Sequence, residues 1–414
     1  MRYPILNIEL SEPLPDLTTD ERDTGLALVL RYGDRPIGFI LHSMQPDQPL
    51  SGAALGDLLS QQIGAKLLEE KIHQELTISV SADAFPTLTV AICTKDRPDN
   101  VKRCLTSLLA LQRPDPEQPV KFEILVVDNA PSDERTRHLV DLMPTVSYTC
   151  EPKPGLDFAR NHALHAATGE LLAFLDDDVV VDRCWLKGLQ EARAENPDAA
   201  AFTGLVLPYE LETEAQIVFE RRGGFRRGFE KIRYGQSLPG NPCYPCGAGI
   251  FGAGCNMTFQ RRILLEIGGF DEALDTGKPL PGGGDLDIFY RVIRAGYSLV
   301  YEPTYLIYHQ HRQTMEQLQH QYWTWGLGFM AFTVKSFHHD PAYRRQIFEL
   351  IAWWFRYQAW ELLQSFGNQS ALSPRMALSE LWGGVVGLCG EYPRSLRRIE
   401  KIRTQYSQSS PIRM

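Results

Sequence analysis

The segment Glu170–Asp182, with the sequence ELLAFLDDDVVVD, places three consecutive carboxylates directly after an apolar run. The apolar residues 171–175 predict a buried strand. Three adjacent acids repel one another and resist burial unless a cation, a proton or open water relieves the repulsion. We therefore expect a ligand at the end of this strand.

Strands and helices alternate on the N-terminal side of this segment. Apolar runs at residues 87–93 and 121–128 predict strands, and a helical pattern follows each of them, at about 98–111 and after residue 134. The same order continues to residue 175. Alternating strands and helices predict an α/β fold with a mostly parallel, doubly wound sheet.

The pattern changes twice along the chain, which predicts three parts. Residues 1–85 hold short strand-like runs between turn residues and then a helical stretch, so we expect a small β-rich N-terminal module. Residues 86–313 form the predicted α/β domain. Residues 314–414 are expected to be a helical C-terminal region, since apolar residues within 348–366 repeat at three- and four-residue spacing.

Composition argues against several classes of protein. Hydrophobic residues at 43% and charged residues at 22% are typical of a globular chain, and the net charge of −9 gives no electrostatic case for a nucleic-acid partner. Eight cysteines are too sparse for a disulfide framework, and the first residues lack a signal-peptide pattern, so we expect a cytoplasmic protein. The pair Cys243 and Cys246 lacks the second ligand pair of a zinc site, and idle thiols are the expectation.

Aromatic segments near the C-terminus raise the question of membrane contact. No run is long and apolar enough to span a bilayer, because Glu349, Arg356 and Glu361 interrupt the best candidate. The tryptophans of this region suit either peripheral contact with the inner face of a membrane or an ordinary core or partner interface. The sequence alone leaves both interpretations open.

Acidic residues end two strands of the predicted sheet. Asp128 ends one strand, and Asp176, Asp177 and Asp178 end another. Ligands bind at the carboxyl ends of the strands in open α/β sheets. Because side chains alternate along an extended segment, Asp176 and Asp178 point one way and Asp177 the other. Two oxygen ligands on one side suit Mn²⁺ or Mg²⁺ bound to a diphosphate, although solvated turns and phosphoryl-transfer sites also carry acid triplets.

Six motifs within residues 86–312 together resemble the inverting family 2 glycosyltransferases with the GT-A fold. They are TVAICTKDRPDNVKRCLTSLL (89–109), FEILVVDNAPSDERT (122–136), EPKPGLDFARNHAL (151–164), GELLAFLDDDVVVDRCWL (169–186), GAGCNMTFQRRILLEIGGFDE (252–272) and GGGDLDIFYRVIRAGYSLVYEPTYLIYHQHR (282–312). The resemblance implies an enzyme that moves a sugar from a nucleotide-diphosphate sugar to an acceptor hydroxyl, with Mn²⁺ or Mg²⁺ as cofactor. The acceptor would be a saccharide, a lipid-linked compound or another hydroxyl compound.

The same resemblance implies roles for individual residues. It places nucleotide contacts on residues after the first two strands and early in a later helix, namely Thr94, Asp96, Arg97, Asp128 and Arg160. It places Asp177 at the ribose, and Asp176, Asp178 and one histidine, preferably His309 rather than His311, at the metal. From the residues alone, the alternatives are a turn or cap residue for Asp128, a surface arginine for Arg160, and a solvated side chain for either histidine.

A general base is implied at the start of the last motif. The family carries a Glu-Asp pair there, whereas this chain has Gly284 followed by Asp285. Asp285 is therefore the candidate catalytic base, with Asp287 in second place. The competing interpretation is that Asp285 caps the helix that follows.

Two other functions stay open on the sequence. A sugar-nucleotide nucleotidyltransferase would need a Gly-rich basic loop after the first strand, where this chain has TKDRPDN. A non-catalytic binding protein with the same fold is the other alternative, and the departure at Gly284 leaves room for it.

Overall fold

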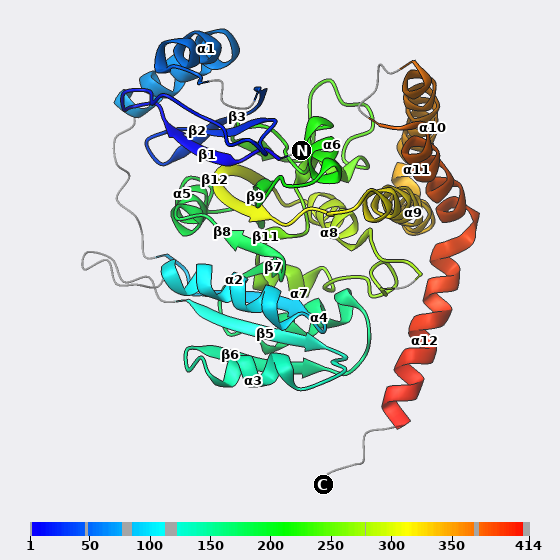
Figure 1. The fold of residues 1–414 in the computed structure, drawn as a ribbon. Helices are drawn as coiled ribbons and strands as arrows, with labels where there is room; N and C mark the ends of the chain where they lie inside the picture. The colour runs from blue at the N-terminus through cyan, green and yellow to red at the C-terminus, as the bar shows by residue number, and fades with distance from the viewer. Residues whose placement is uncertain are drawn as a thin grey trace.

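The computed structural model describes residues 2–45, 49–76, 85–111, 122–277, 279–367 and 372–408. A small three-stranded sheet, a large central sheet and a group of long helices occupy different parts of the molecule (Figure 1). This arrangement confirms the predicted α/β class, the β-rich N-terminal module and the helical C-terminal region. The domain boundaries remain predictions.

The N-terminal part has a core of its own. Strands β1 (Ile5–Glu9), β2 (Gly25–Tyr32) and β3 (Arg35–Ser43) pair in that order, and helix α1 (Gly52–Leu76) follows them. Strand β2 is almost entirely apolar and buried, so it packs on both faces. One face meets α1, and the other lies towards the central sheet.

The first half of the central sheet is parallel, as the alternation predicts. Its order is β7, β4, β5, β6, and helices α2 and α4 contribute buried side chains to opposite faces. The buried strands β4 and β7 read as continuous apolar runs, which is typical of parallel strands covered on both sides. The bounds are β4 (Leu88–Thr94), α2 (Pro98–Leu111), β5 (Glu123–Asn129), α3 (Arg135–Asp141), β6 (Val146–Glu151), α4 (Leu156–Ala166) and β7 (Leu171–Asp176).

The second half of the sheet is mixed. Strand β11 runs antiparallel between β7 and β9, and β12 then lies parallel to β9. The short β8 pairs antiparallel with β12 directly after the acid triplet. The elements are β8 (Val179–Val181), α5 (Trp185–Glu195), β9 (Ala201–Pro208), α6 (Glu214–Arg221), β10 (Ile232–Tyr234), η1 (Ala248–Phe251), β11 (Asn256–Gln260), α7 (Arg261–Glu266), α8 (Gly284–Arg294) and β12 (Leu299–His309).

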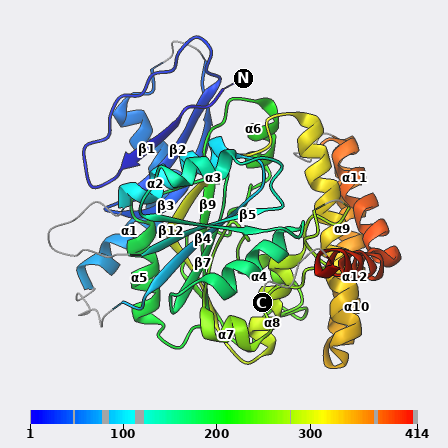
Figure 2. The same cartoon turned by 90° about the horizontal axis from the view of Figure 1, so that it is seen from below.

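Long helices form the C-terminal region. Figures 1 and 2 both show them gathered on one side of the sheet, with α12 on its outer edge. Among the described residues, no helix combines the length and the apolar character that a membrane span needs. The elements are α9 (Met315–His339), η2 (Pro341–Tyr343), α10 (Arg344–Phe366), α11 (Pro374–Val386), η3 (Gly387–Glu391) and α12 (Tyr392–Gln408).

Candidate functional site

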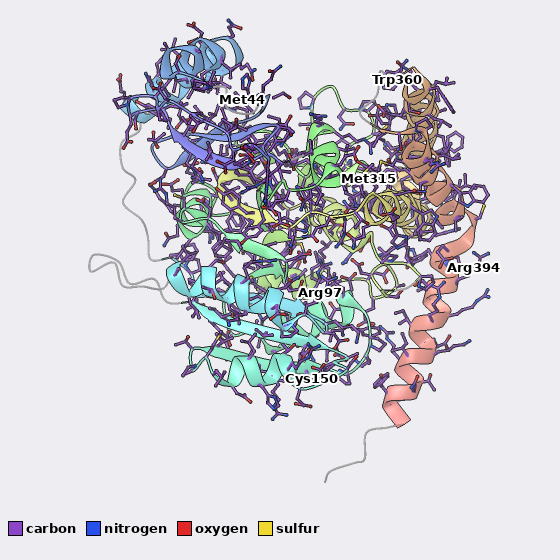
Figure 3. All side chains as sticks on the ribbon, in the orientation of Figure 1. Met44, Arg97, Cys150, Met315, Trp360 and Arg394 are labelled. Atoms are coloured by element: carbon purple, nitrogen blue, oxygen red, sulfur yellow. The ribbon has the colours of Figure 1, made fainter. Side chains whose placement is uncertain are left out.

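The acid triplet lies at the carboxyl end of β7, next to the ends of β4 and β12. Arg97, which follows β4, lies near the centre of the molecule in Figure 3. Asp177 turns towards β4: its Oδ2 accepts a hydrogen bond from Thr94 Oγ1 at 2.7 Å, and its Oδ1 lies 3.2 Å from the Arg97 guanidinium. Thr94 and Arg97 therefore fix the middle acid of the triplet.

The outer two acids meet a histidine. Asp176, Asp178 and His309 each offer a ligand atom, and these atoms all lie within 4.8 Å of one another. Asp178 Oδ1 is 3.3 Å from His309 Nε2 and has no hydrogen-bond partner although it is buried. Burial lowers the pKa of His309 to about 4, so the imidazole is neutral at neutral pH, which is the form that binds metals. Two carboxylate oxygens and one imidazole nitrogen fit a divalent cation.

His311 belongs to a different contact. Its Nε2 lies 2.7 Å from Glu220 Oε1, and its Nδ1 lies 3.3 Å from Nδ1 of His309. The other ring nitrogen of His309 is thereby occupied, as is usual for a metal-binding histidine. Of the two histidines left open by the sequence, only His309 joins the acidic cluster.

The loop after β4 is tied to the loop after β5. Asp96 has a positive φ of 56° and accepts two hydrogen bonds from Ser132, from its backbone N and its Oγ, both at 2.8 Å. These hydrogen bonds lower the pKa of Asp96, so it stays ionised. Asp96 therefore shapes the loop, with its own oxygens already engaged.

Asp128 ends β5 with one oxygen unpaired. The side chain is buried, Oδ2 accepts a hydrogen bond from Tyr148 Oη at 3.1 Å, and Oδ1 has no partner. Burial raises the pKa of Asp128 to about 6. A buried carboxylate oxygen without a partner is costly, and it suits a site where a donor group of a ligand completes the hydrogen bond.

Arg160 lies among carboxylates. Its guanidinium is 3.0 Å from Asp157, 3.4 Å from Asp275 and 3.9 Å from Asp176, and the side chain is only 4% exposed. The alternative of a surface arginine is therefore wrong, and the nucleotide contact of Arg160 stays a prediction. Sequence reasoning missed Asp157 and Asp275, because Asp157 resembles an ordinary helix-start residue and Asp275 lies in a loop more than one hundred residues away.

Asp285 opens α8 beside the same arginine. Its Oδ2 accepts a hydrogen bond from Gly254 N at 3.2 Å, and a Cβ at Gly254 would lie 3.0 Å from Asp285 Cβ and 3.3 Å from Arg160 Nη2. The N-cap of α8 is Gly283, and Asp285 lies within the first turn. The capping interpretation of Asp285 thus does not apply, although Oδ1 accepts from the adjacent Leu286 N at 2.8 Å.

Asp287, the second candidate for the general base, and Gly284, the residue before Asp285, both have structural roles. Asp287 is buried and pairs with Arg291 at 2.7 Å and Lys335 at 2.6 Å, so both of its oxygens are occupied. Gly284 makes room for Asp157: a Cβ at residue 284 would lie 2.2 Å from Asp157 Oδ2. No side chain fits there while Asp157 keeps this position.

Burial raises the pKa of Asp176, the charge of Arg160 lowers it, and Asp285 is among the carboxylates that add to the rise. Asp285 therefore acts electrostatically on the cluster.

A cavity of about 780 Å³ lies beside α4, but its lining includes none of Asp176, Asp178 and Asp285. All eight cysteines are free thiols, including Cys243 and Cys246, and the described residues contain no metal-binding group other than Asp176, Asp178 and His309.

Comparison with known proteins identifies relatives of this region. Residues 89–255 match the family model described as glycosyl transferase family 2. The succinoglycan biosynthesis protein ExoM of Rhizobium meliloti is 30% identical over 221 residues, which is 52% of this chain and 64% of that protein. The glucosyl-dolichyl phosphate glucuronosyltransferase of Haloferax volcanii is 24% identical over 195 residues, which is 44% of this chain and 56% of that protein. The chain thus spans less than two thirds of either relative.

Among solved structures, a mannosyltransferase, PcManGT from Pyrobaculum calidifontis in complex with GDP-Man and Mn²⁺, is similar with a TM-score of 0.46 and 16% identity. The match covers 81% of this chain and 96% of that one. The family match ends before α8 and β12, so it includes the acid triplet but neither Asp285 nor His309.

Proposed function

We propose that this protein transfers a sugar from a nucleotide-diphosphate donor to an acceptor hydroxyl with inversion at the anomeric carbon, since residues 89–255 match the family model of glycosyl transferase family 2. The observation that carries the proposal is the meeting of Asp176, Asp178 and His309 at the strand ends, beside the carboxylate of Asp285. The reaction is a single displacement: the acceptor oxygen forms a bond to the anomeric carbon as the bond to the diphosphate breaks.

The donor side uses the strand ends of the first half of the sheet. Asp176, Asp178 and His309 would hold Mn²⁺ or Mg²⁺, which as a Lewis acid neutralises the charge that develops on the leaving diphosphate. Asp128 accepts a hydrogen bond from the nucleotide base with its unpaired Oδ1. Asp177, fixed by Thr94 and Arg97, faces the ribose.

The acceptor side uses the first turn of α8. Asp285 removes the proton of the attacking hydroxyl as the new bond forms, which is the task of a general base. The hydrogen bond from Gly254 holds Asp285 Oδ2, and Arg160 Nη2 lies 3.9 Å from Asp176 Oδ1. A Cβ at Gly254 would lie close to both Asp285 and Arg160. We assign Arg160 the role of keeping the carboxylates of Asp176 and Asp285 apart and oriented, since its own donors already face acids.

The acceptor that we propose is a saccharide or a lipid-linked hydroxyl compound, presented at a membrane surface. The relative from Haloferax volcanii carries glucosyl-dolichyl phosphate in its name. Helices α10 and α11 turn large apolar side chains outward, each 37–71% exposed: Phe348, Trp353, Tyr357, Trp360, Leu363, Phe366, Leu378 and Trp382.

The charge of this region supports an anionic membrane as its partner. Residues 344–403 contain nine Arg and Lys against five Glu, whereas the whole chain has a net charge of −9. In Figure 3, Trp360 lies at the top of the helical region and Arg394 lies lower, near the start of α12. Tryptophan and tyrosine suit the headgroup level of a bilayer, and cations add attraction to anionic lipids. A symmetric contact between two copies would instead bring like charges together.

Vesicle binding tests the membrane proposal. The protein should sediment with phosphatidylglycerol vesicles and much less with phosphatidylcholine vesicles, and the double change Trp360→Ser and Phe366→Ser should release it. Leu142→Ser is the matched control, because Leu142, directly after α3, is 81% exposed. Equal binding by the double variant, or concentration-dependent dimerisation that this variant abolishes, contradicts membrane contact.

A panel of nucleotide sugars tests the catalytic proposal. We expect release of one nucleotide that depends on Mn²⁺ or Mg²⁺ and is lost in Asp178→Ala and Asp285→Asn. Asp141→Asn, an exposed carboxylate on α3, is the control that should keep full activity. Formation of a sugar nucleotide from a sugar phosphate and a nucleoside triphosphate would identify a nucleotidyltransferase instead. Binding of a donor without any turnover would favour the non-catalytic binding protein.

A further inference from the structure

The N-terminal module reaches the strands that carry the acidic cluster. Arg31 extends from β2 to Asp182, four residues after Asp178, and to Tyr308, the residue before His309. Arg31 and Asp182 are both buried, with side chains 4% and 7% exposed. The contact therefore connects the segment 178–182, which begins at Asp178, with the segment 308–309, which ends at His309.

Every donor of Arg31 has a partner. Nε donates to Asn7 Oδ1 at 3.0 Å, and Nη1 donates to Asp34 O at 3.1 Å and to Asp182 Oδ1 at 3.3 Å. Nη2 donates to Asp182 Oδ2 at 2.5 Å and to Tyr308 Oη at 3.1 Å. An arginine offers five N–H groups in a fixed plane, so all of them are used, two in a bidentate contact with one carboxylate.

Tyr308 lies on β12, and Asp182 directly follows β8, which pairs with β12. In the ladder between β8 and β12, Tyr308 lies opposite Val180 and His309 opposite Val179. Backbone bonds continue the ladder at both ends, from Gln310 N to Asp178 O at 3.0 Å and from Asp182 N to Leu306 O at 3.1 Å. Strand β8 has only three residues, so it has little pairing of its own to hold Asp178 beside His309.

We propose that Arg31 is a positioning residue: the N-terminal module clamps β8 to β12 through Arg31, and this clamp sets the distance between Asp178 and His309. The N-terminal module then helps to hold the side chains of Asp176, Asp178 and His309 in place, which residues 86–313 cannot do alone. The measurement of Mn²⁺ affinity rests on the proposed function, whereas the measurement of hydrogen exchange does not.

The first measurement is hydrogen exchange in the full-length protein, followed in peptides that cover residues 176–184 and 304–312. Arg31→Met should speed exchange in both segments at least tenfold, because Asp182 and Tyr308 lose their common partner. Lys187→Met is the matched control: Lys187 lies on α5, its side chain is 53% exposed, and it pairs with Asp34 of the module at 2.9 Å, so the change removes a contact of the module other than that of Arg31. We expect wild-type exchange in these peptides for the control.

The second measurement is Mn²⁺ affinity by electron paramagnetic resonance. Loss of a residue that orients metal ligands typically weakens binding 10- to 100-fold, and we expect this for Arg31→Met but not for Lys187→Met. The double change Arg31→Met and Asp182→Leu removes the unpaired buried charge, so it should recover thermal stability while Mn²⁺ binding stays weak. Recovery of both would mean that Arg31 only compensates a charge.

Two milder variants keep the test decisive if Arg31→Met does not fold. Tyr308→Phe removes the hydroxyl that accepts from Arg31 and donates towards Asp182 Oδ2 at 3.3 Å or Asn7 Oδ1 at 3.4 Å. Arg31→Lys retains the charge without the bidentate contact. Both should speed exchange in the two segments by a smaller factor. Wild-type exchange in both variants, or equal acceleration by Lys187→Met, overturns the clamp. Absence of Mn²⁺ binding by the wild-type protein would count against the proposed function, and the exchange data would still decide about Arg31.

Discussion

Replacing Asp128 by asparagine should make the protein more stable at alkaline pH and weaken its affinity for nucleotides. The carboxylate of Asp128 is buried at the end of β5 with Oδ1 unpaired, and burial raises its pKa from 3.8 to about 6. Asparagine keeps an acceptor for the Tyr148 hydroxyl and removes the charge. The change therefore isolates the cost of ionising this one side chain.

The magnitude follows from the pKa. One pKa unit corresponds to about 1.4 kcal/mol, so the rise from 3.8 to about 6 costs the folded state up to about 3 kcal/mol when Asp128 is fully ionised. Because the folded pKa lies above the unfolded value, the folded protein binds more protons between these two pH values. Its stability therefore falls as pH rises from about 4 to about 6. Asp128→Asn removes this loss, so the variant gains most at pH 8 and little at pH 4.

Urea unfolding followed by tryptophan fluorescence measures the effect at pH 8 and at pH 4, with both proteins compared at the same pH. We expect the variant to unfold at higher urea than wild type at pH 8 and at a similar concentration at pH 4. Nucleotide affinity, measured by calorimetry at pH 8, should fall because the hydrogen bond to the base is lost. An equal or lower midpoint for the variant at pH 8 would refute the argument from burial. Higher stability with unchanged nucleotide affinity would remove Asp128 from the nucleotide site.

Three further predictions concern the other residues of the site. Asp285→Asn should lower the transfer rate by about 10²–10⁴-fold without loss of thermal stability, whereas Asp287→Asn should lower the unfolding temperature because it breaks buried ion pairs; initial rates and thermal unfolding separate the two. His309→Ala should weaken Mn²⁺ binding at least tenfold in titration calorimetry, and unchanged binding would exclude His309 as a ligand. Gly284→Ala should cost about 1–3 kcal/mol of unfolding free energy, because the new methyl group meets the Asp157 carboxyl; urea unfolding measures this, and a neutral outcome would contradict the close contact.

The parallel half of the sheet was predictable, and the mixed half was not. Strands β4, β5 and β7 are continuous apolar runs joined by amphipathic helices, so periodicity alone indicates their type and direction. Strand β11 enters between β7 and β9 from a loop with no such pattern. Its place depends on pairing between distant segments, which local sequence does not encode.

The candidate site, too, could be predicted from the sequence only in part. Alternation along an extended segment predicted that Asp177 would turn away from Asp176 and Asp178. Asp177 faces Thr94 and Arg97, but residues 177–178 form a turn, and the same Arg97 nitrogen lies 3.7 Å from Asp178 Oδ2. The partners of Arg160 could not be predicted, because Asp275 comes from a loop that only the folded chain brings near. The roles of these residues in catalysis remain predictions.

The contact between Gly284 and Asp157 also constrains how such a sequence can change. The resemblance leads one to expect glutamate at residue 284, but there even a Cβ would lie 2.2 Å from Asp157 Oδ2. A lineage that passes between the two arrangements must shorten residue 157 before it enlarges residue 284. The reverse order passes through a protein in which the first turn of α8, and with it Asp285, is displaced. One close contact thus makes one order of the two mutations less costly than the other.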